Sequence, residues 1–402
     1  MAAPADSAEP RARIGTRGLR KVSLGRSGLE VTEACCGTMC WGSFNGEEAQ
    51  AHAQMDRMVA LGVNFFDTAE LYPVAWDYGK TTEQWMGNWL ADRTASGAIA
   101  RKDLVIATKC NPNGVGGTGK PHGFVGDALE ASCRASIERL QCEYVDLYQL
   151  HWPTRDTPVF GCASFHPGRS HRAVQAFDEG DLSVFEDQVR SIGRLLELGL
   201  IKHWGLSNEN AYGVTIFCTT CDRLGVPRPV TLQNDFSLTN RIYEADTLEA
   251  CHRFGVVGLP YGCLAGGILT GKYDNPEQFA KDPERGNPSD WRHNKCKDFQ
   301  PRYFYPLAVE AGRAYAKLAA EWGLTPLQLA LAWARDKWFN ASIITGTASV
   351  KQCEECVAAL SLEALPEELN AAVDKIHEEY RSPAVHLNDK AHVLTLGSKE
   401  AR

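Results

Sequence analysis

The sequence predicts an α/β chain folded as a (β/α)8 TIM barrel, and three observations lead to this fold class. Short apolar runs recur eight times, a longer segment with helical spacing follows most of them, and polar residues end several of them. The runs are continuous rather than alternating, which is typical of strands buried on both faces. A doubly wound sheet is the alternative for the same alternation. The runs cover 33–39, 63–69, 103–109, 145–151, 202–208, 230–235, 256–262 and 341–346.

The first run is preceded by a predicted β-hairpin. The stretch "RKVSLGRSGLEV" (20–31) has two short apolar segments around a turn at Arg26-Ser27-Gly28. Such a turn between two strand-like segments favours a hairpin. We expect it to cap one end of the barrel.

Three of the intervening segments carry clear helix signals. Residues 47–62 end on Gly62, which is typical of a glycine after a helix. Residues 126–141 and 324–337 show apolar spacing of 3.6 residues. In the last of these, Thr325 is the expected N-cap and Pro326 the first helical residue.

Two connections are long, and the ends of the chain are polar. Residues 152–182 follow the fourth strand, and residues 266–306 follow the seventh. Long connections of this kind commonly serve as lids or binding loops. We expect one barrel domain over 20–381, a disordered extension at 1–19 and a loosely packed tail at 382–402.

Composition excludes several classes of function. The formal net charge is −8 without a basic block, so a nucleic-acid partner is not expected. No apolar run approaches the ~18 residues that span a membrane. The 14 cysteines without a secretory segment indicate a reducing compartment, the cytoplasm, with import into an organelle as the alternative.

The cysteine spacing includes two C-x-x-C pairs, Cys218/Cys221 and Cys353/Cys356. Paired C-x-x-C motifs can bind zinc. Each pair lies among apolar residues in a predicted helix, and the pairs are far apart in the sequence. We therefore expect buried thiols and no metal site.

Polar side chains stand at the ends of consecutive predicted strands. Each alone is weak evidence, because a strand-terminal Lys or His is commonly structural. Their joint placement matters, because the carboxyl ends of the strands of this barrel meet at one face, where its active sites lie. The residues are Asp67, Lys109, His151, Ser207, Asn208 and Gln233.

The stretch "VNFFDTAELYP" (63–73) adds a phenol beside this ring of residues. Asp67 and Lys109, on adjacent strand ends, are expected to form a buried ion pair, with the ammonium facing Tyr72. A nearby cation favours the phenolate, so we expect the pKa of Tyr72 to fall. Tyr72 would then be a general acid for a carbonyl oxygen, and His151 would orient that oxygen.

These residues lie in motifs that resemble the aldo-keto reductases over most of the chain, from about Arg20 to about Leu360. The sequence looks most like the bacterial Tas-type branch, a relative of potassium-channel β-subunits. The resemblance implies a catalytic tetrad of Asp67, Tyr72, Lys109 and His151 and an NADPH-dependent reduction of an aldehyde or ketone. The motifs, in family order, are "DTAELYP", "LVIATK", "DLYQLHWP", "KHWGLSN", "TLQNDFSLTNR", "GCLAGGILTGKY" and "TGTASVKQCEE".

The resemblance also implies where the cofactor binds. The carboxamide of the nicotinamide would contact Ser207, Asn208 and Gln233, and its ring would stack on Tyr261. The pyrophosphate would lie against Leu264, Gly266 and Lys272, with Arg302 reaching it or the 2′-phosphate; a surface arginine is the alternative for Arg302. The adenosine end would contact Gly346, Ala348, Gln352 and Glu355.

Three positions depart from the family pattern. Cys356 stands where relatives often have Asn, and Gly262-Cys263 where they often have Ser-Pro. Gln352 stands where many relatives have an Arg against the 2′-phosphate, so Lys351 or Arg302 would take its place.

The substrate pocket is expected to be apolar and aromatic, so an aromatic or apolar carbonyl compound is favoured. An NADPH-binding regulatory partner with little turnover is the second hypothesis, and a structural member of a larger assembly the third. The expected pocket residues are Trp41, Trp76, Trp152 and Phe160.

Overall fold

The computed structural model describes residues 14–42, 46–73, 81–114, 120–165, 180–274, 291–295 and 299–385. Eight parallel strands run in the order β10-β3-β4-β5-β6-β7-β8-β9. Backbone bonds from Ala341 to Gly258 (2.9 Å) and from Ile344 to Pro260 (3.0 Å) join the two ends. The sequential, all-parallel order confirms the barrel and shows that the doubly wound alternative is wrong.

Each predicted strand is present, although several are shorter than their apolar runs. The run at 256–262 gives only two strand residues, and Pro260 within it has no N–H to donate. The strands are β3 Ala34–Gly37, β4 Phe65–Asp67, β5 Val105–Cys110, β6 Val145–Leu150, β7 Ile201–Ser207, β8 Thr231–Gln233, β9 Val257–Gly258 and β10 Ile343–Gly346.

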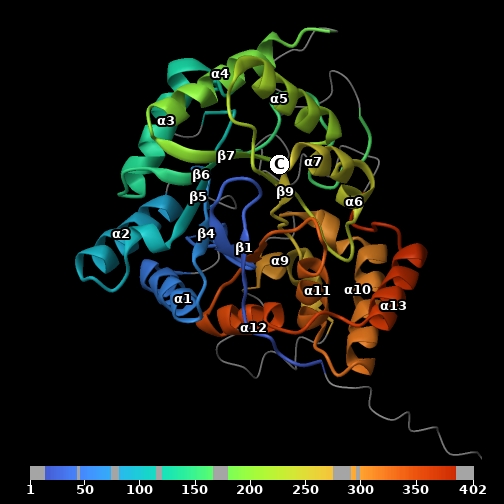
Figure 1. Cartoon of the computed structure of the whole chain (residues 1–402). Helices are drawn as coiled ribbons and strands as arrows, with labels where there is room; N and C mark the ends of the chain where they lie inside the picture. The colour runs from blue at the N-terminus through green and yellow to red at the C-terminus, as the bar shows by residue number, and fades with distance from the viewer. Residues whose placement is uncertain are drawn as a thin grey trace, which may run out of the picture.

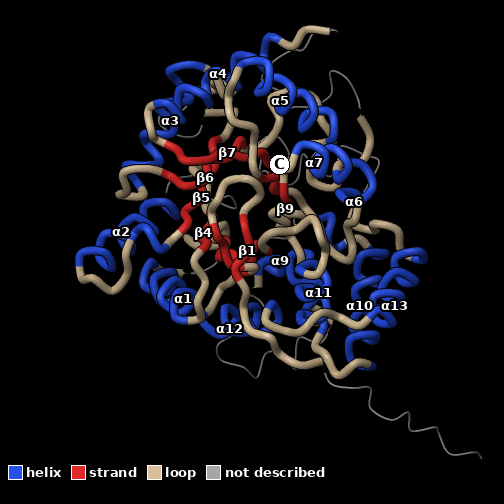
Figure 2. The backbone as a smooth tube through the Cα atoms, viewed as in Figure 1, coloured by secondary structure: helices blue, strands red, loops and turns tan. Residues whose placement is uncertain are grey.

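Helices surround the strands on all sides in projection (Figures 1 and 2). Thr325 and Gln328 form a capping box at the start of α11, and Gly62 follows α1 with a φ of 88°, as the sequence predicted. The helices are α1 Glu48–Ala60, α2 Thr81–Ala95, α3 Gly126–Arg139, α4 Ser183–Glu197, α5 Ala211–Leu224, α6 Ile242–Asp246, α7 Leu248–Phe254, α9 Arg292–Lys295, α10 Pro306–Glu321, α11 Pro326–Arg335, α12 Val350–Leu360 and α13 Glu367–Glu379. Short 3₁₀ turns are η1 Arg101–Asp103, η2 Ala265–Thr270 and η5 Pro301–Phe304. None of these described helices combines the length and the apolarity needed to cross a bilayer.

The predicted hairpin is formed by β1 Lys21–Ser23 and β2 Glu30–Thr32. Its apolar side chains, such as Leu24 and Val31, share a core cluster with Phe65, Val105 and Val230 at the amino ends of the strands. The hairpin therefore caps the amino-terminal end of the barrel, opposite the strand ends that carry the polar residues.

Alternation along the strands separates two cores and sets the position of the site. Phe65 points into the barrel and Phe66 points out to the helices, so Asp67 points in again. The same alternation follows Val105 and Ala107 with Lys109. The inward face of β4 and of β5 is thus apolar at its start and polar at its end.

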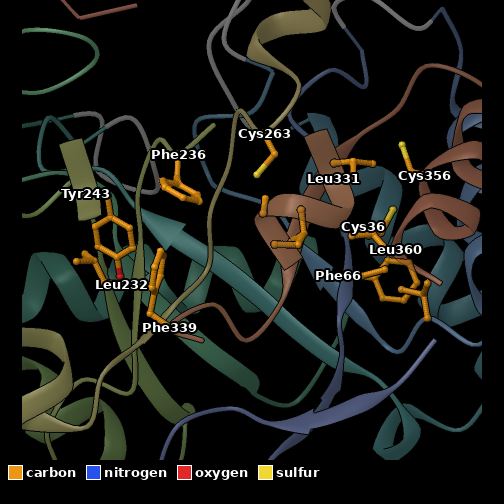
Figure 3. Packing of buried hydrophobic residues seen from close by; sticks show 14 of the residues in the cluster. Cys36, Phe66, Leu232, Phe236, Tyr243, Cys263, Leu331, Phe339, Cys356 and Leu360 are labelled. Carbon is orange, nitrogen blue, oxygen red and sulfur yellow. The ribbon is translucent and has the colours of Figure 1, made fainter. Parts of the chain in front are cut away.

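The outer core lies between the strands and the helices. Figure 3 shows part of it, where Phe236 lies 5.4 Å from Phe339 and 6.3 Å from Tyr243 between ring centroids. Phe236 also stacks on Trp333 of α11 at 5.0 Å. This aromatic packing fixes α11 against the carboxyl end of β8. The four C-x-x-C thiols are buried within the same outer core: Cys218, Cys221, Cys353 and Cys356.

The barrel domain extends beyond the boundaries that the sequence suggested. Thr16 forms an antiparallel bridge with Leu362, and Arg17 pairs with Glu33 at 2.8 Å, so residues 14–19 are packed rather than disordered. At the other end, the N–H of Ala384 donates to the carbonyl of Thr239 at 3.1 Å. Backbone pairing that sequence patterning does not reveal holds both segments. The rest of both predicted tails lies outside the described residues.

We predict that Gly87→Ala lowers the free energy of unfolding by about 1–3 kcal/mol, because overpacking at a helix contact forces neighbours apart. A Cβ at Gly87 would lie 2.0 Å from the carbonyl oxygen of Arg139 at the end of α3. Urea unfolding followed by circular dichroism measures the change. Gln84→Ala, on the exposed face of the same helix, is the control; if both variants are equally stable, the close approach of α2 and α3 is wrong.

Candidate active site

A buried ion pair lies at the centre of the carboxyl face of the barrel. The ammonium of Lys109 lies 2.5 Å from Oδ2 of Asp67, and both side chains are at most 2% exposed. Lys109 also donates to the carbonyl of Thr68 at 2.7 Å. The pair that the sequence predicted is therefore present.

Tyr72 reaches the same ammonium from the loop after β4. Lys109 Nζ lies 3.3 Å from the Tyr72 hydroxyl and 4.7 Å from the centre of its ring. The ring of His151, directly after β6, lies edge-on to Tyr72 with centroids 5.8 Å apart. The structure thus brings all four predicted catalytic residues together.

The predicted direction of the Tyr72 pKa is wrong. Burial raises the pKa of Tyr72 above its ordinary value of 10.0, and the opposing effect of the Lys109 cation is smaller. Burial also acts to lower the pKa of Lys109, but Asp67 and Tyr72 together raise it above its ordinary 10.5. At neutral pH the site therefore holds a protonated phenol beside a protonated amine, which is the form that a proton donor needs.

Gln149 is part of this network, although sequence reasoning missed it. Its amide donates to Oδ1 of Asp67 at 3.0 Å, and the amide of Gln233 donates to the same oxygen at 2.9 Å. Gln233 also donates to the side-chain oxygen of Gln149 at 3.0 Å. The signal in the sequence was the spacing of two residues before His151, which puts Gln149 on the same face of β6.

The predicted nicotinamide residues form a second network beside the first. Asn208, whose φ is 56°, donates from its amide to the backbone carbonyl of His151 at 2.8 Å. The Tyr261 hydroxyl donates to Oδ1 of Asn208 at 2.7 Å, and Ser207 donates to the carbonyl of Gln233 at 2.8 Å. Four predicted residues are therefore linked across β6, β7, β8 and the loop after β9.

The remaining predicted cofactor residues lie at two further strand ends. Leu264, Gly266 and Lys272 lie in or beside η2, where Gly266 and Gly267 have φ values of 63° and 105°. Beyond β10, Gln352 of α12 accepts at 2.8 Å from the backbone N–H of Ala348, and Glu355 follows on the same helix. Gly346 ends β10 itself.

The sequence left open whether Arg302 is a surface arginine, and the structure shows that it is buried. Its side chain is 2% exposed, and its Nε donates to Asp235 at 2.9 Å. Its predicted contact with the cofactor stays a prediction.

The predicted pocket residues separate into different places. Trp152 belongs to an apolar group around Tyr72, whereas Trp41 is fully buried in the outer core and does not join that group. Phe160 is partly exposed, with a φ of 55°. Trp76 lies outside the described residues, as do residues 166–179 of the long connection at 152–182. We call the apolar group the Tyr72 cluster; it consists of Met39, Ala69, Leu71, Tyr72, Trp152 and Phe299.

A second buried group, behind β5, was also missed from the sequence. The Glu70 carboxylate accepts from the N–H of Asn111 at 2.6 Å and from the Ser132 hydroxyl at 2.5 Å. The ligand atoms of Glu70, Cys110 and His122 lie within 4.8 Å of one another. His122 Nδ1 accepts from the N–H of Phe124, so Nε2 carries the proton of the neutral ring and faces the Cys110 sulfur at 3.6 Å. These hydrogen bonds support β5, the strand that carries Lys109.

Comparisons with known proteins agree with this geometry. The Aldo/keto reductase family model matches residues 33–378, so the chain belongs to the aldo/keto reductase family. It is an NADP-dependent oxidoreductase of that family, whose members in general reduce carbonyl compounds.

Individual relatives cover most of the chain. It is 35% identical to "Protein tas" of Escherichia coli (strain K12) over 363 residues, which are 89% of this chain and 97% of that protein. It is 32% identical to an "Aldo-keto reductase" of Babesia bovis over 64% of this chain and 88% of that protein. A "Probable voltage-gated potassium channel subunit beta" of Oryza sativa subsp. japonica is 28% identical over 90% of this chain and 96% of that protein.

We predict a pH-dependent stability contribution from Glu70. Burial raises the pKa of Glu70 from its ordinary 4.5 to about 7. A carboxyl group whose pKa is raised on folding stabilises the fold below its unfolded pKa, and this contribution is lost as pH rises through the folded pKa. The stability of the wild type relative to Glu70→Gln should therefore fall by about 2–3 kcal/mol between about pH 4.5 and pH 7.

Urea unfolding of both proteins across that range measures the difference. Glu367→Gln, in the exposed first turn of α13, is the control for loss of a carboxylate. A constant difference between wild type and Glu70→Gln would show that Glu70 does not take up a proton on folding.

Proposed function

We propose that this protein reduces an aldehyde or ketone to an alcohol with NADPH, and that Tyr72 donates the proton to the carbonyl oxygen. The single observation that carries the proposal is the hydrogen bond between Lys109 and Tyr72 inside a buried Asp67–Lys109 pair. Bound NADPH would supply the hydride for the carbonyl carbon. Donation of the proton and orientation of the carbonyl group would be carried out by side chains of this protein.

The residues at the carboxyl face fit this cofactor. Ser207, Asn208 and Tyr261 would hold the nicotinamide end, and their polar atoms are already aligned by hydrogen bonds. Lys272 would bring positive charge to the pyrophosphate, because its ammonium lies against the glycine turn of η2. A Cβ placed on Gly267 would be 3.5 Å from Lys272 Nζ. A Cβ at Gly346 would meet only the Cys40 sulfur within 4 Å among the described atoms, which leaves room for the adenosine end.

The charged residues act on Tyr72 from one side. Asp67 keeps Lys109 protonated, and the Lys109 ammonium stabilises negative charge that develops on the phenol oxygen as its proton leaves. His151 lies beside the phenol and would orient the carbonyl oxygen. Burial of Tyr72 excludes water, so the carbonyl oxygen is the acceptor for its proton.

We predict that Tyr72→Phe lowers kcat by at least about two orders of magnitude, since it removes a positioned general acid. Affinity for NADPH should change little, because the ring and its packing remain. Initial rates with a panel of aldehydes and a fluorescence titration measure the two quantities. Tyr380→Phe, at the end of α13, is the matched control; a Tyr72→Phe enzyme with wild-type rates would reject Tyr72 as the donor.

We predict tighter binding of NADPH than of NADH. The 2′-phosphate adds a charge that Lys272 or Lys351 can meet, and charge-assisted hydrogen bonds are among the stronger polar contacts. Arg302 was the third candidate, but its guanidinium is paired with Asp235. Titration of tryptophan fluorescence with each nucleotide gives both dissociation constants. Equal dissociation constants would mean that no cation of this protein binds the 2′-phosphate. The Gln352 position, where many relatives have an Arg, would then have no substitute cation.

A second candidate function is that of an NADPH-binding partner protein with little turnover. Similarity over 90% of this chain to two proteins named as probable voltage-gated potassium channel β-subunits favours it. Comparison of the turnover rate with the rate of cofactor release separates the two functions. Many turnovers per enzyme molecule, at a rate close to that of NADP⁺ release, would reject the partner-only function.

A further inference from the structure

Phe299 supplies a wall of the Tyr72 cluster from a distant part of the chain. Its side chain is 5% exposed and packs in the same contiguous apolar group as Tyr72 and Trp152. The other members follow β3, β4 and β6, whereas Phe299 comes from the long connection after β9. The apolar surface next to the predicted proton donor is therefore completed by the carboxyl-terminal half.

Arg302, three residues later, anchors this part of the connection. Its Nε donates to Oδ2 of Asp235 at 2.9 Å, and its Nη2 donates to the Tyr303 hydroxyl at 2.9 Å. That hydroxyl donates to Oδ1 of Asp235 at 3.0 Å, which closes a triad. Asp235 lies just after β8, so the triad fixes η5 to the rim of the barrel.

The stem of Arg302 also packs against Gly161, beside the carboxyl-terminal segment. A Cβ at Gly161, where φ is +93°, would lie 2.6 Å from Arg302 Cδ and 3.0 Å from the carbonyl oxygen of Ala384. Gly161 belongs to the connection after β6, and Ala384, which is fully buried, to the carboxyl-terminal segment. Three segments that are far apart in the sequence therefore meet at Gly161.

Only Gln300 and Pro301 lie between Phe299 and Arg302. Gln300 has a φ of 54°, in the left-handed region, and Pro301 has a fixed φ. Because only two residues separate them, the Arg302 anchor limits where Phe299 can lie.

We propose that Phe299 is a specificity-determining wall of the pocket for the carbonyl substrate, and that Arg302 is the positioning residue that holds it there. The inference rests on the proposed function for the nature of the substrate. The chemical class that fits is a carbonyl compound with an aromatic group, which would pack against the rings of Phe299 and Trp152.

This role differs from the one that the family resemblance suggested for Arg302. Asp235 and Tyr303 engage two of the three guanidinium nitrogens, and the Arg302 side chain is 2% exposed, so turning the guanidinium toward a phosphate would break its bond to the buried Asp235 carboxylate. A buried carboxylate without its cation is strongly destabilising. Arg302 is therefore better placed to hold the wall than to bind the cofactor.

The test compares an aromatic aldehyde, 4-nitrobenzaldehyde, with a short aliphatic one, propanal. The readout is the ratio of their kcat/KM values, in which contributions from the cofactor cancel. We expect Phe299→Ala to lower this ratio about tenfold, as loss of an aromatic contact of about 1.4 kcal/mol would. Arg302→Met should lower it in the same direction, Arg302→Lys less so, and Arg302→Met should add nothing to Phe299→Ala if it acts through the wall.

Loss of folding is kept apart from loss of positioning. Arg302→Met leaves Asp235 without its partner, so the double variant Asp235→Leu/Arg302→Met removes both charges and should give the same low ratio. Arg223→Met, which breaks an exposed pair with Glu186 on the outer helices, is the matched control and should keep the wild-type ratio.

Nucleotide titrations of Arg302→Met decide between the two roles of the arginine. We expect NADPH and NADH affinities to keep their wild-type ratio. Selective loss of NADPH affinity with an unchanged aldehyde ratio would overturn the proposal and assign Arg302 to the 2′-phosphate. An unchanged ratio in Phe299→Ala would overturn it as well.

Failure of the proposed function gives a different result. If the wild type reduces neither aldehyde, binding of both is measured by quenching of tryptophan fluorescence, for which Trp152 lies in the cluster. A preference for the aromatic aldehyde that Phe299→Ala abolishes would support the pocket while rejecting reduction. The same preference in both proteins would reject the pocket.

Discussion

The buried ion pair between Asp67 and Lys109 is the constraint on which the rest of the site depends. Transfer of two charges from water into the barrel is unfavourable unless both are paired and hydrogen-bonded. The structure meets this condition on every side: Asp67 accepts from two glutamine amides, and Lys109 donates to a backbone carbonyl and to Tyr72. The groups that stabilise the ion pair are therefore the groups that form the site. Substitution of any one of them would also leave a buried charge with fewer partners.

The same pair explains why the face needs an apolar cover. A cation beside a phenol has its effect only where water does not screen it. The Tyr72 cluster provides that cover, and the Arg302 triad brings its last member from more than two hundred residues away along the chain. Because the strands end at the polar layer, the cover is made by connections rather than by the barrel itself.

Much of the fold could be predicted because it depends on local pattern. Continuous apolar runs gave the strands, and Thr325 with Pro326 gave the start of α11, since caps are set by neighbouring residues. The ring of polar strand ends followed from the rule that parallel strands of a barrel end at one face. The residues proposed to be catalytic could therefore be predicted from the sequence, and the resemblance to a known family suggested their roles.

What could not be predicted depends on burial, which the sequence does not state. The pKa of Tyr72 rises rather than falls because desolvation exceeds the effect of Lys109, and the balance between two opposing effects requires the packed structure. Trp41 and Trp152 are the same residue type near strand ends, yet only Trp152 joins the cluster. Arg302 gave no local signal either, since Asp235, Gly161 and Ala384 are brought to it only by the closed barrel. Residues whose partners lie far away in the sequence thus form the apolar cover of the site. Residues that follow strand periodicity form the polar layer at the strand ends.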